Sequence, residues 1–294
     1  MAATVSEARA VARRWQTRIL ISAETASLAV CHLKMELRTK KTVILARGLG
    51  TRLRAGASHA NLNSEQTKIA SLGIKTLMPL RGEKTLLEFI FENLQQAGFS
   101  EFCLVIGNEH QAIRDFCKRL NYKISFAIQE KPLGTADAVL AAENFADGEK
   151  FLVVNSDNFY SVNALRELHE LNQTGLVAFS RKGLIEKSNI SEEKIRKFAA
   201  VELDENGRLI KIVEKPEAVD ENSYVSMNCW LFSPQIFEAC RQIKPSLRGE
   251  FEITDAVQFA IDKLSEKFTA IYSNEGVLDL SSRTDVEKIA DYFM

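Results

Sequence analysis

The chain has 294 residues, 46% of them hydrophobic and 26% charged, which is an ordinary globular composition and enough for one large α/β domain or two small ones. Lys and Arg (38) nearly balance Asp and Glu (39), so the surface as a whole is not built to neutralise nucleic-acid phosphates, although a local basic cluster around a small anion remains compatible. No apolar run approaches the ~20 residues that span a bilayer, and the five cysteines contain no Cys-x-x-Cys pair. We therefore expect a cytoplasmic protein with reduced thiols and neither a membrane nor a nucleic-acid partner.

Residues 1–40 differ from the rest of the chain. They contain several arginines and few acids, and they lack Gly and Pro. A transit peptide has this composition, a translation start at Met35 is a second interpretation, and a plain N-terminal helix is a third. Beyond this segment no linker-like stretch divides the chain. We therefore assign residues 1–40 to an N-terminal extension and residues 41–294 to one catalytic domain.

From Lys41 onward, short β-rich runs alternate with helical patterns. This alternation predicts an α/β fold in which a Rossmann-like, mostly parallel mixed sheet carries helices on both faces. Sheets of this kind bind ligands beyond the carboxyl ends of their strands. We expect strands at 42–46, 102–106, 123–128 and 151–154, and helices at 84–97, 112–120 and 136–145.

The second half of this region contains signals for a hairpin turn and for several helix starts. Asn206-Gly207 lies between two β-rich runs, 198–203 and 209–213, and predicts a hairpin turn. A Ser followed by Pro234 predicts a helix start. Thr254 and Thr284 are also predicted to cap helices, the latter in a capping box with a Glu three residues later.

The first strand runs into the segment Leu-Ala-Arg-Gly-Leu-Gly-Thr-Arg-Leu-Arg at 45–54. Two glycines let the backbone approach a ligand closely and direct amide N–H groups at phosphate oxygens. The segment lacks the Gly-Lys-Ser/Thr of a P-loop and the third glycine of a dinucleotide fingerprint. Arg47, Arg52 and Arg54 favour an anion site, because a guanidinium matches phosphate geometry.

This segment resembles the opening Gly-x-Gly-Thr-Arg-Leu motif of the sugar-1-phosphate nucleotidyltransferases, and the similarity continues in order along nearly the whole chain from Lys41. Lys75 matches the family's Pro-Lys-x-Leu-x-Pro lysine. The segments 129–138, 155–158, 213–216, 248–255 and 277–279 match, in turn, its base-binding segment, its first metal aspartate, its sugar-phosphate lysine, a segment of its thymidylyl- and uridylyl-transferring branch, and its second metal aspartate. The resemblance implies the nucleotide-diphospho-sugar transferase type of fold.

The resemblance also implies an activity: Mg²⁺-dependent transfer of a nucleotidyl group from a nucleoside triphosphate to a sugar 1-phosphate, with release of pyrophosphate. Arg52, Lys75 and Asp157 are implied as catalytic residues, and Asp157 and Asp279 as Mg²⁺ ligands. The implied nucleotide-binding residues are Leu45, Ala46, Gly48, Gly50, Thr51, Gln129, Gly134 and Thr135. The implied sugar-phosphate-binding residues are Glu214, Lys215, Asn228 and Arg248.

Several alternatives stay open at this point. The acceptor is either a sugar 1-phosphate or another phosphorylated alcohol, such as phosphocholine or a cyclitol phosphate. The contrasting hypothesis is a non-catalytic paralogue that binds a nucleotide sugar and regulates a partner. Gln129 favours UTP, dTTP or CTP, yet the segment after it also occurs in guanylyl-transferring relatives. Family members often form homo-oligomers, and the sequence does not decide the oligomeric state.

The chain departs from the family pattern at five places. Arg47 replaces an Ala or Gly, Ala55 replaces a Pro, Val277 replaces a Trp and Ser281 replaces a Gly. The segment 55–74 is longer than usual and contains a helix-compatible stretch at 64–71. We interpret it as either a lid over the triphosphate or a surface insertion.

Overall fold

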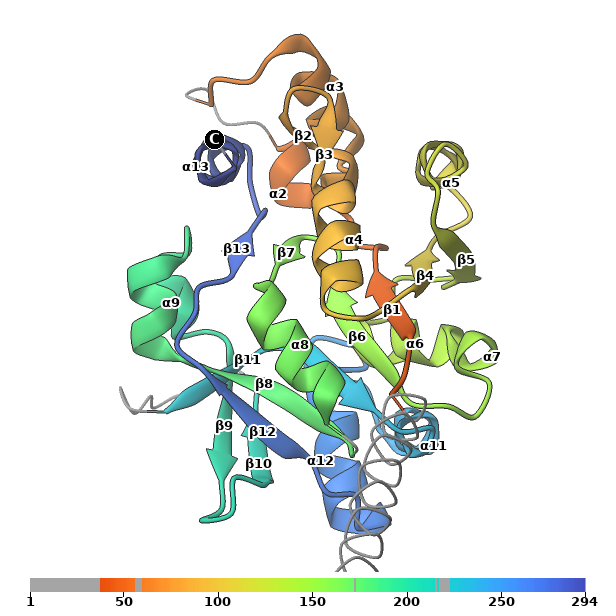
Figure 1. Ribbon diagram of the computed structural model, residues 1–294. Coiled ribbons are helices and arrows are strands. Elements are labelled where there is room, and N and C mark those ends of the chain that lie inside the picture. The colour runs from red at the N-terminus through yellow and green to blue at the C-terminus, as the bar shows by residue number, and fades with distance from the viewer. Residues whose placement is uncertain (1–37, 56–59, 172, 215, 217–222, 294) are drawn as a thin grey trace, which may run out of the picture. The chain divides into compact units, whose positions relative to one another are not determined.

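Four parallel strands carry the centre of the fold: β1 (Lys41–Leu45), β4 (Glu101–Ile106), β5 (Lys123–Ile128) and β6 (Phe151–Asn155). They lie side by side in the order β6-β1-β4-β5 in a computed structural model that describes residues 38–55, 60–171, 173–214, 216 and 223–293 (Figure 1). Each strand is rich in β-branched and aromatic residues. β1, β4 and β6 are buried over most of their length, as expected for parallel strands covered on both faces, whereas β5 at the end of the strand order is half-buried to exposed.

An antiparallel part extends the sheet beyond β6. Strand β11 (Tyr224–Phe232) pairs antiparallel with β6, and it also pairs with β8 (Gly175–Ser180) and β9 (Ala199–Leu203). Strand β10 (Leu209–Val213) forms the expected hairpin with β9, and β12 (Thr269–Ser273) runs parallel to β8. Within the described residues, nine strands thus form one mixed sheet.

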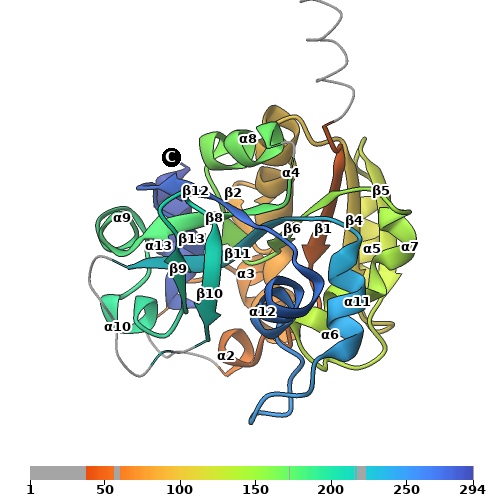
Figure 2. The same cartoon turned by 90° about the horizontal axis from the view of Figure 1, so that it is seen from below.

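Helices cover both faces of this sheet (Figure 2). Helices α4 (Leu86–Gln96) and α8 (Val162–Glu170) lie on one face, while α6 (Thr135–Ala141), α11 (Gln235–Gln242) and α12 (Ile253–Leu264) lie on the other. Two hydrophobic cores result, because successive strand residues point to opposite faces. Ile44 belongs to one core and its neighbour Val43 to the other.

The remaining helices and strands are shorter for the most part and lie around this sheet. They are α2 (Thr51–Arg54), α3 (Ser64–Leu72), the 3₁₀ turn η1 (Lys75–Leu77), β2 (Pro79–Arg81), β3 (Lys84–Thr85), α5 (Gln111–Cys117), α7 (Glu143–Ala146), β7 (Asn158–Phe159), α9 (Arg181–Lys187), α10 (Glu192–Ile195), β13 (Leu278–Asp279) and α13 (Thr284–Tyr292). Residues Thr39–Met294 form one compact unit.

The fold class predicted from the sequence is confirmed, and the expected strands and helices are present with small shifts at their ends. The helix predicted at 136–145 is interrupted at Ala142 and continues as α7. No helix in the described parts of the chain is both long and apolar enough to cross a membrane.

The two threonine caps are wrong. Helix α12 begins one residue before Thr254, and the backbone N–H of Ile253 donates instead to the Thr135 hydroxyl, 2.9 Å away and far off in sequence. Helix α13 starts after Arg283 with no side-chain cap, so Thr284 lies inside its first turn. At α12 a tertiary contact replaces the expected local cap. At the start of α13 the contacts are local, since the N–H groups of Ser281 and Ser282 donate to the Asp285 carboxylate.

The burial of the cysteines generates a test of this packing. All four cysteines in the described residues are free and buried, and burial raises the pKa of Cys103, Cys117 and Cys240 to about 12 and that of Cys229 as well. At about pH 8 only roughly one thiol in ten thousand is then ionised, so a thiolate-specific reagent has almost nothing to attack.

In a Cys31→Ser variant, which removes the cysteine outside the described residues, we expect less than one thiol to react with a chromogenic disulfide in native buffer. All four should react in concentrated guanidinium chloride, and rapid native labelling of two or more would contradict the packing.

Candidate active site

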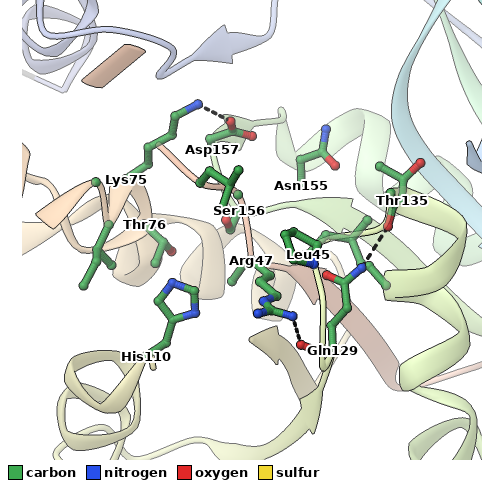
Figure 3. A pocket seen from close by; sticks show the side chains of 18 of the residues that line it. Leu45, Arg47, Lys75, Thr76, His110, Gln129, Thr135, Asn155, Ser156 and Asp157 are labelled. Atoms are coloured by element: carbon green, nitrogen blue, oxygen red, sulfur yellow. Dashed lines mark hydrogen bonds and ion pairs between the residues drawn. The ribbon is translucent and has the colours of Figure 1, made fainter. Parts of the chain in front are cut away.

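A cavity of about 370 Å³ lies beyond the carboxyl ends of the parallel strands (Figure 3). The chain leaving β1 lines it with Leu45–Leu49, β5 contributes Gln129 at its end, and β6 contributes Asn155–Asp157. A second cavity of about 160 Å³ shares Asn155, Asp157 and Asn228 with the first. Cavities therefore lie at the carboxyl ends of the strands, where the sequence analysis expects ligands to bind.

The glycine loop after β1 is held by a backbone contact with the end of α3. Gly50 has a left-handed backbone (φ 59°), and a Cβ built there lies only 2.1 Å from the carbonyl oxygen of Gly73. Gly73 is itself left-handed (φ 73°) and ends α3, whose first turn is fixed by a capping box from Asn63. Two glycines are needed for this approach, because neither position tolerates a side chain.

This contact explains how Lys75 reaches the site despite the long segment before it. Gly73 lies against the glycine loop, and Lys75 opens the turn η1 two residues later. Its ammonium lies 2.8 Å from Asp157 Oδ2, and its side chain is only 14% exposed (Figure 3). Lys75 and Asp157 therefore form a largely desolvated ion pair at the cavity wall.

The three arginines of the first motif have different roles. Arg47 donates to the backbone carbonyl of Gln129 and lies 3.3 Å from a Glu109 carboxylate oxygen. Arg54 donates to the carbonyl of Leu49 and so braces the loop. Arg52 is exposed, makes no hydrogen bond or ion pair with the described residues, and lines the second cavity. Of the three, Arg52 is the one left available to an anionic ligand.

A two-residue pairing brings the two predicted metal aspartates together. Strand β13 pairs antiparallel with β7, so Asp279 lies opposite Asn158, the neighbour of Asp157. The backbone N–H of Leu280 donates to the Asp157 carbonyl at 2.8 Å. Both side chains line the second cavity, although 122 residues separate them in sequence.

Asp279 is the more buried of the two, with 8% of its side chain exposed. The Lys194 ammonium and the Ser281 hydroxyl both hydrogen-bond its carboxylate. Burial, together with the negative charge of Asp157, raises the pKa of Asp279, and Lys194 opposes that shift. The carboxylate therefore lies where an additional positive charge is stabilised.

The donor set at this point fits a hard divalent cation. Asp157 and Asp279 offer carboxylate oxygens, the ligands that Mg²⁺ prefers. In the described residues no group of three or more His, Cys, Asp or Glu side chains is arranged to hold a metal. Two carboxylates match an ion that takes its other ligands from water and substrate phosphates.

The segment after β5 fixes the orientation of Gln129. Its Nε2 donates to the Gly134 carbonyl at 3.0 Å and to Asp137 Oδ2 at 2.8 Å. Both partners are acceptors, so they orient the amide and leave Oε1 as the atom without a partner among the described residues. Gln129 is buried and lines the cavity, and it presents an acceptor there.

The same segment is joined to the start of α12. Phe251 donates its N–H to the Leu133 carbonyl at 2.8 Å and accepts from the N–H of Ala136 at 2.9 Å. Gly134 (φ 123°) lies against this backbone, where a Cβ is 2.4 Å from the Phe251 carbonyl oxygen. The segment 248–255, singled out in the sequence, therefore buttresses the Gln129 side of the cavity, and it also places Glu250 in the cavity wall.

The predicted sugar-phosphate residues are only partly brought to the cavities. Asn228 lines both, and it has a left-handed backbone (φ 56°) at an irregularity in the pairing of β11 with β8. Such irregularities re-aim side chains. Arg248 is bound to Glu252 and lies 3.9 Å from Glu214, and neither Arg248 nor Glu214 lines these cavities. Lys215 lies outside the described residues.

Most other predicted residues do converge. The first cavity is lined by Leu45, Ala46, Gly48, Lys75, Gln129, Gly134, Thr135 and Asp157, while Gly50 shapes the loop and Thr51 starts α2. The sequence reasoning missed Lys194 and Asp137. Lys194 lies in a run of alternating charges that is typical of a solvated helix, so nothing local distinguished it.

Comparison with known proteins identifies the family of the chain. The model of the nucleotidyl transferase family matches residues 41–280. The chain is 32% identical over 228 residues to the glucose-1-phosphate thymidylyltransferase of Streptomyces griseus, covering 76% of this chain and 57% of that protein. It is 31% identical over 257 residues to the bifunctional protein GlmU of Methanococcus vannielii, covering 86% and 54%. The chain therefore spans a little over half the length of these relatives.

Solved structures share the fold. A UDP-glucose pyrophosphorylase complexed with UDP-glucose superposes with a TM-score of 0.67 at 19% identity, covering 87% of this chain and 98% of that one. The inositol-1-phosphate CTP transferase from T. maritima gives 0.65 at 18% identity, covering 86% and 94%. At these identities the likeness concerns the fold alone.

The backbone contact between the two glycines generates a prediction. We expect Gly50→Ala to lower the free energy of unfolding by about 2 kcal/mol or more, because the new Cβ meets the Gly73 carbonyl and the backbone is left-handed. Urea denaturation measures this loss. Gly48→Ala is the matched control in the same loop: nothing lies within 4 Å of its Cβ, so its effect should stay within about 0.5 kcal/mol. Equal effects of the two substitutions would contradict the proposed contact.

Proposed function

The chain belongs to the nucleotidyl transferase family, and on that premise we propose that it transfers a nucleotidyl group from a nucleoside triphosphate to a sugar 1-phosphate. The products are a nucleoside diphosphate sugar and pyrophosphate, and residues 41–294 are the catalytic domain. The observation that carries the proposal is the convergence of Asp157 and Asp279 beside Lys75 and Arg52, at the junction of the two cavities.

The reaction needs positioning and charge neutralisation more than a base. An oxygen of the acceptor's phosphate, already ionised at neutral pH, attacks the α-phosphorus of the triphosphate. A new P–O bond forms, the bond between the α-phosphorus and its bridging oxygen breaks, and pyrophosphate leaves in line. Negative charge accumulates on the α-phosphoryl oxygens and on the leaving group, so cations must surround both.

The residues of the chain supply those cations. The backbone N–H groups of the glycine loop, between Gly48 and Thr51, receive the triphosphate, and Arg52 stabilises its terminal phosphates. The Lys75 ammonium lies at the wall of the larger cavity and neutralises charge near the α-phosphorus. Because Lys75 is largely desolvated, its charge acts there in a medium of low effective dielectric.

Asp157 and Asp279 are the residues that hold Mg²⁺ in this proposal. When bound, Mg²⁺ neutralises phosphate oxygens and aligns the α-phosphorus with the attacking group. Asp157 would hold the ion in addition to its pairing with Lys75, and the pairing of β7 with β13 places Asp279 beside it.

Asp157 and Asp279 lie close enough for their negative charges to repel each other. This arrangement argues against a purely regulatory protein that only binds a nucleotide sugar. A binding protein needs contacts to the base and sugar, but it has no need for two adjacent acidic groups whose charges repel each other. Ser281, where the family has Gly, hydrogen-bonds both carboxylate oxygens of Asp279 at 2.9 and 3.1 Å. The replacement of Gly by Ser281 therefore adds hydrogen bonds that hold the Asp279 carboxylate in place.

The orientation of Gln129 bears on the nucleotide base. Because Nε2 is engaged by Gly134 and Asp137, the side chain offers Oε1 as an acceptor. Uracil and thymine present an N3–H donor at the edge where cytosine presents an N3 acceptor. We therefore propose UTP or dTTP as the nucleotide donor and CTP as a poorer one.

A panel assay tests the function. Purified protein with Mg²⁺, each of several nucleoside triphosphates and each of several phosphorylated alcohols should release pyrophosphate with at least one sugar 1-phosphate, and removal of the metal with EDTA should stop it. Asp157→Asn should lower kcat by roughly 100-fold or more, because it removes a metal ligand and the charge facing Lys75.

Each outcome has a clear consequence. Turnover only with phosphocholine or a cyclitol phosphate would replace the proposed acceptor, and no turnover with any pair would favour the regulatory protein. Near-normal kcat in Asp157→Asn would remove Asp157 from the metal site. An unchanged melting temperature shows that the variant remains folded.

The base preference is tested by Asp137→Ala. Without the carboxylate the Gln129 amide can turn and present Nε2, so the ratio of kcat/KM for UTP over CTP should fall by about tenfold, or 1.4 kcal/mol. Glu130→Ala is the control, because this exposed neighbour has no contact with the Gln129 side chain. An unchanged ratio in Asp137→Ala would show that Gln129 does not read the base in this way.

A further inference from the structure

Lys194 is a cation that the mechanism above does not use. It lies on α10, in a run of alternating charges whose other members form exposed pairs one helical turn apart: Glu192 with Arg196, and Glu193 with Lys197. Lys194 instead turns inward, with 27% of its side chain exposed, and binds the Asp279 carboxylate and the Ser281 hydroxyl.

Lys194 also borders open space. It lines the 160 Å³ cavity with Asp157, Asn228 and Asp279, and it lines a neighbouring hollow of about 600 Å³. Arg52 is the other basic residue common to both. Lys194 therefore pairs with Asp279 and also remains accessible to a ligand in these two hollows.

Among the described residues, Arg52 is the other basic side chain on the 160 Å³ cavity, and the proposed function assigns it to the triphosphate. Lys75 is paired with Asp157, and Arg248 is bound to Glu252 with two further carboxylates within 3.9 Å. Asn228 and Ser226 in the 160 Å³ cavity are neutral. An acceptor phosphate with nearly two negative charges needs cations there, and Lys194 lies on the cavity wall beside Asp279.

We propose that Lys194 is a phosphate-binding residue of the acceptor subsite that rests on Asp279 while the site is empty. The inference rests on the proposed function. In the empty site the four groups Lys75, Asp157, Lys194 and Asp279 balance two positive charges against two negative ones. A divalent cation on Asp279 would repel the Lys194 ammonium, which then turns to the acceptor phosphate and so exchanges one anionic partner for another.

Two measurements test this, with Lys194→Met, the conservative Lys194→Arg, and Lys197→Met as a control on the same charged run. With the best substrates of the panel, we expect Lys194→Met to raise the KM of the phosphorylated acceptor by about tenfold or more, while the KM of the triphosphate changes by less than about twofold. Lys194→Arg should recover most of the loss, because it retains a positive charge. Lys197→Met should match the unsubstituted protein.

The second measurement uses Mn²⁺ alone, without substrates, followed by calorimetry or electron paramagnetic resonance. Because the ion no longer has to displace an ammonium, Lys194→Met should bind Mn²⁺ about tenfold more tightly than either the unsubstituted protein or Lys197→Met. The proposal is overturned if Mn²⁺ affinity does not rise, or if the acceptor KM in Lys194→Met equals that of Lys197→Met. Failure of the proposed function is distinguishable, since it leaves the unsubstituted protein inactive with every pair while the Mn²⁺ measurement still reports on Lys194.

Discussion

Two carboxylates held close together in a partly desolvated place repel each other, and a fold must compensate for that repulsion. In this chain Asp157 and Asp279 are held by the short pairing of β7 with β13 and by the Leu280–Asp157 backbone hydrogen bond. Each carboxylate has its own ammonium, Lys75 on one side and Lys194 on the other. The two ammonium groups balance the two carboxylates, and the proposed function assigns a divalent cation to this pair of aspartates. The rest of the site is organised around these four groups.

Backbone contacts, more than side chains, position the parts that surround this centre. The approach of Gly50 to Gly73 ties the phosphate-facing loop to the segment that carries Lys75. The hydrogen bonds of Phe251 tie the Gln129 side of the cavity to the start of α12. Both contacts join segments far apart in the chain, and both require glycine at the point of approach. These contacts fix the positions of the glycine loop and of the Gln129 segment relative to the rest of the cavity wall.

The parts of this picture that follow from local chemistry were predictable. The strand and helix pattern, the glycine turn after β1 and the hairpin at Gly207 depend on near neighbours, and the structure agrees with them. The start of α12 near Thr254 was not predictable, because the N–H of Ile253 is satisfied by Thr135 from another segment. Similarly, Ser281 looked like a loss of the family pattern, yet in the structure it supports Asp279.

The order of motifs in the sequence by itself determined the family and the fold class and predicted the two aspartates, because these depend on residue type and on sequence spacing. Only the tertiary structure decided which cations face which anions. It turned Lys194 inward from an apparently solvated helix, committed Arg47 and Arg54 to backbone carbonyls, and oriented the Gln129 amide through Asp137. The physical reason is that Coulomb and hydrogen-bond energies depend on distance and burial in space, and neither quantity is written in the local sequence.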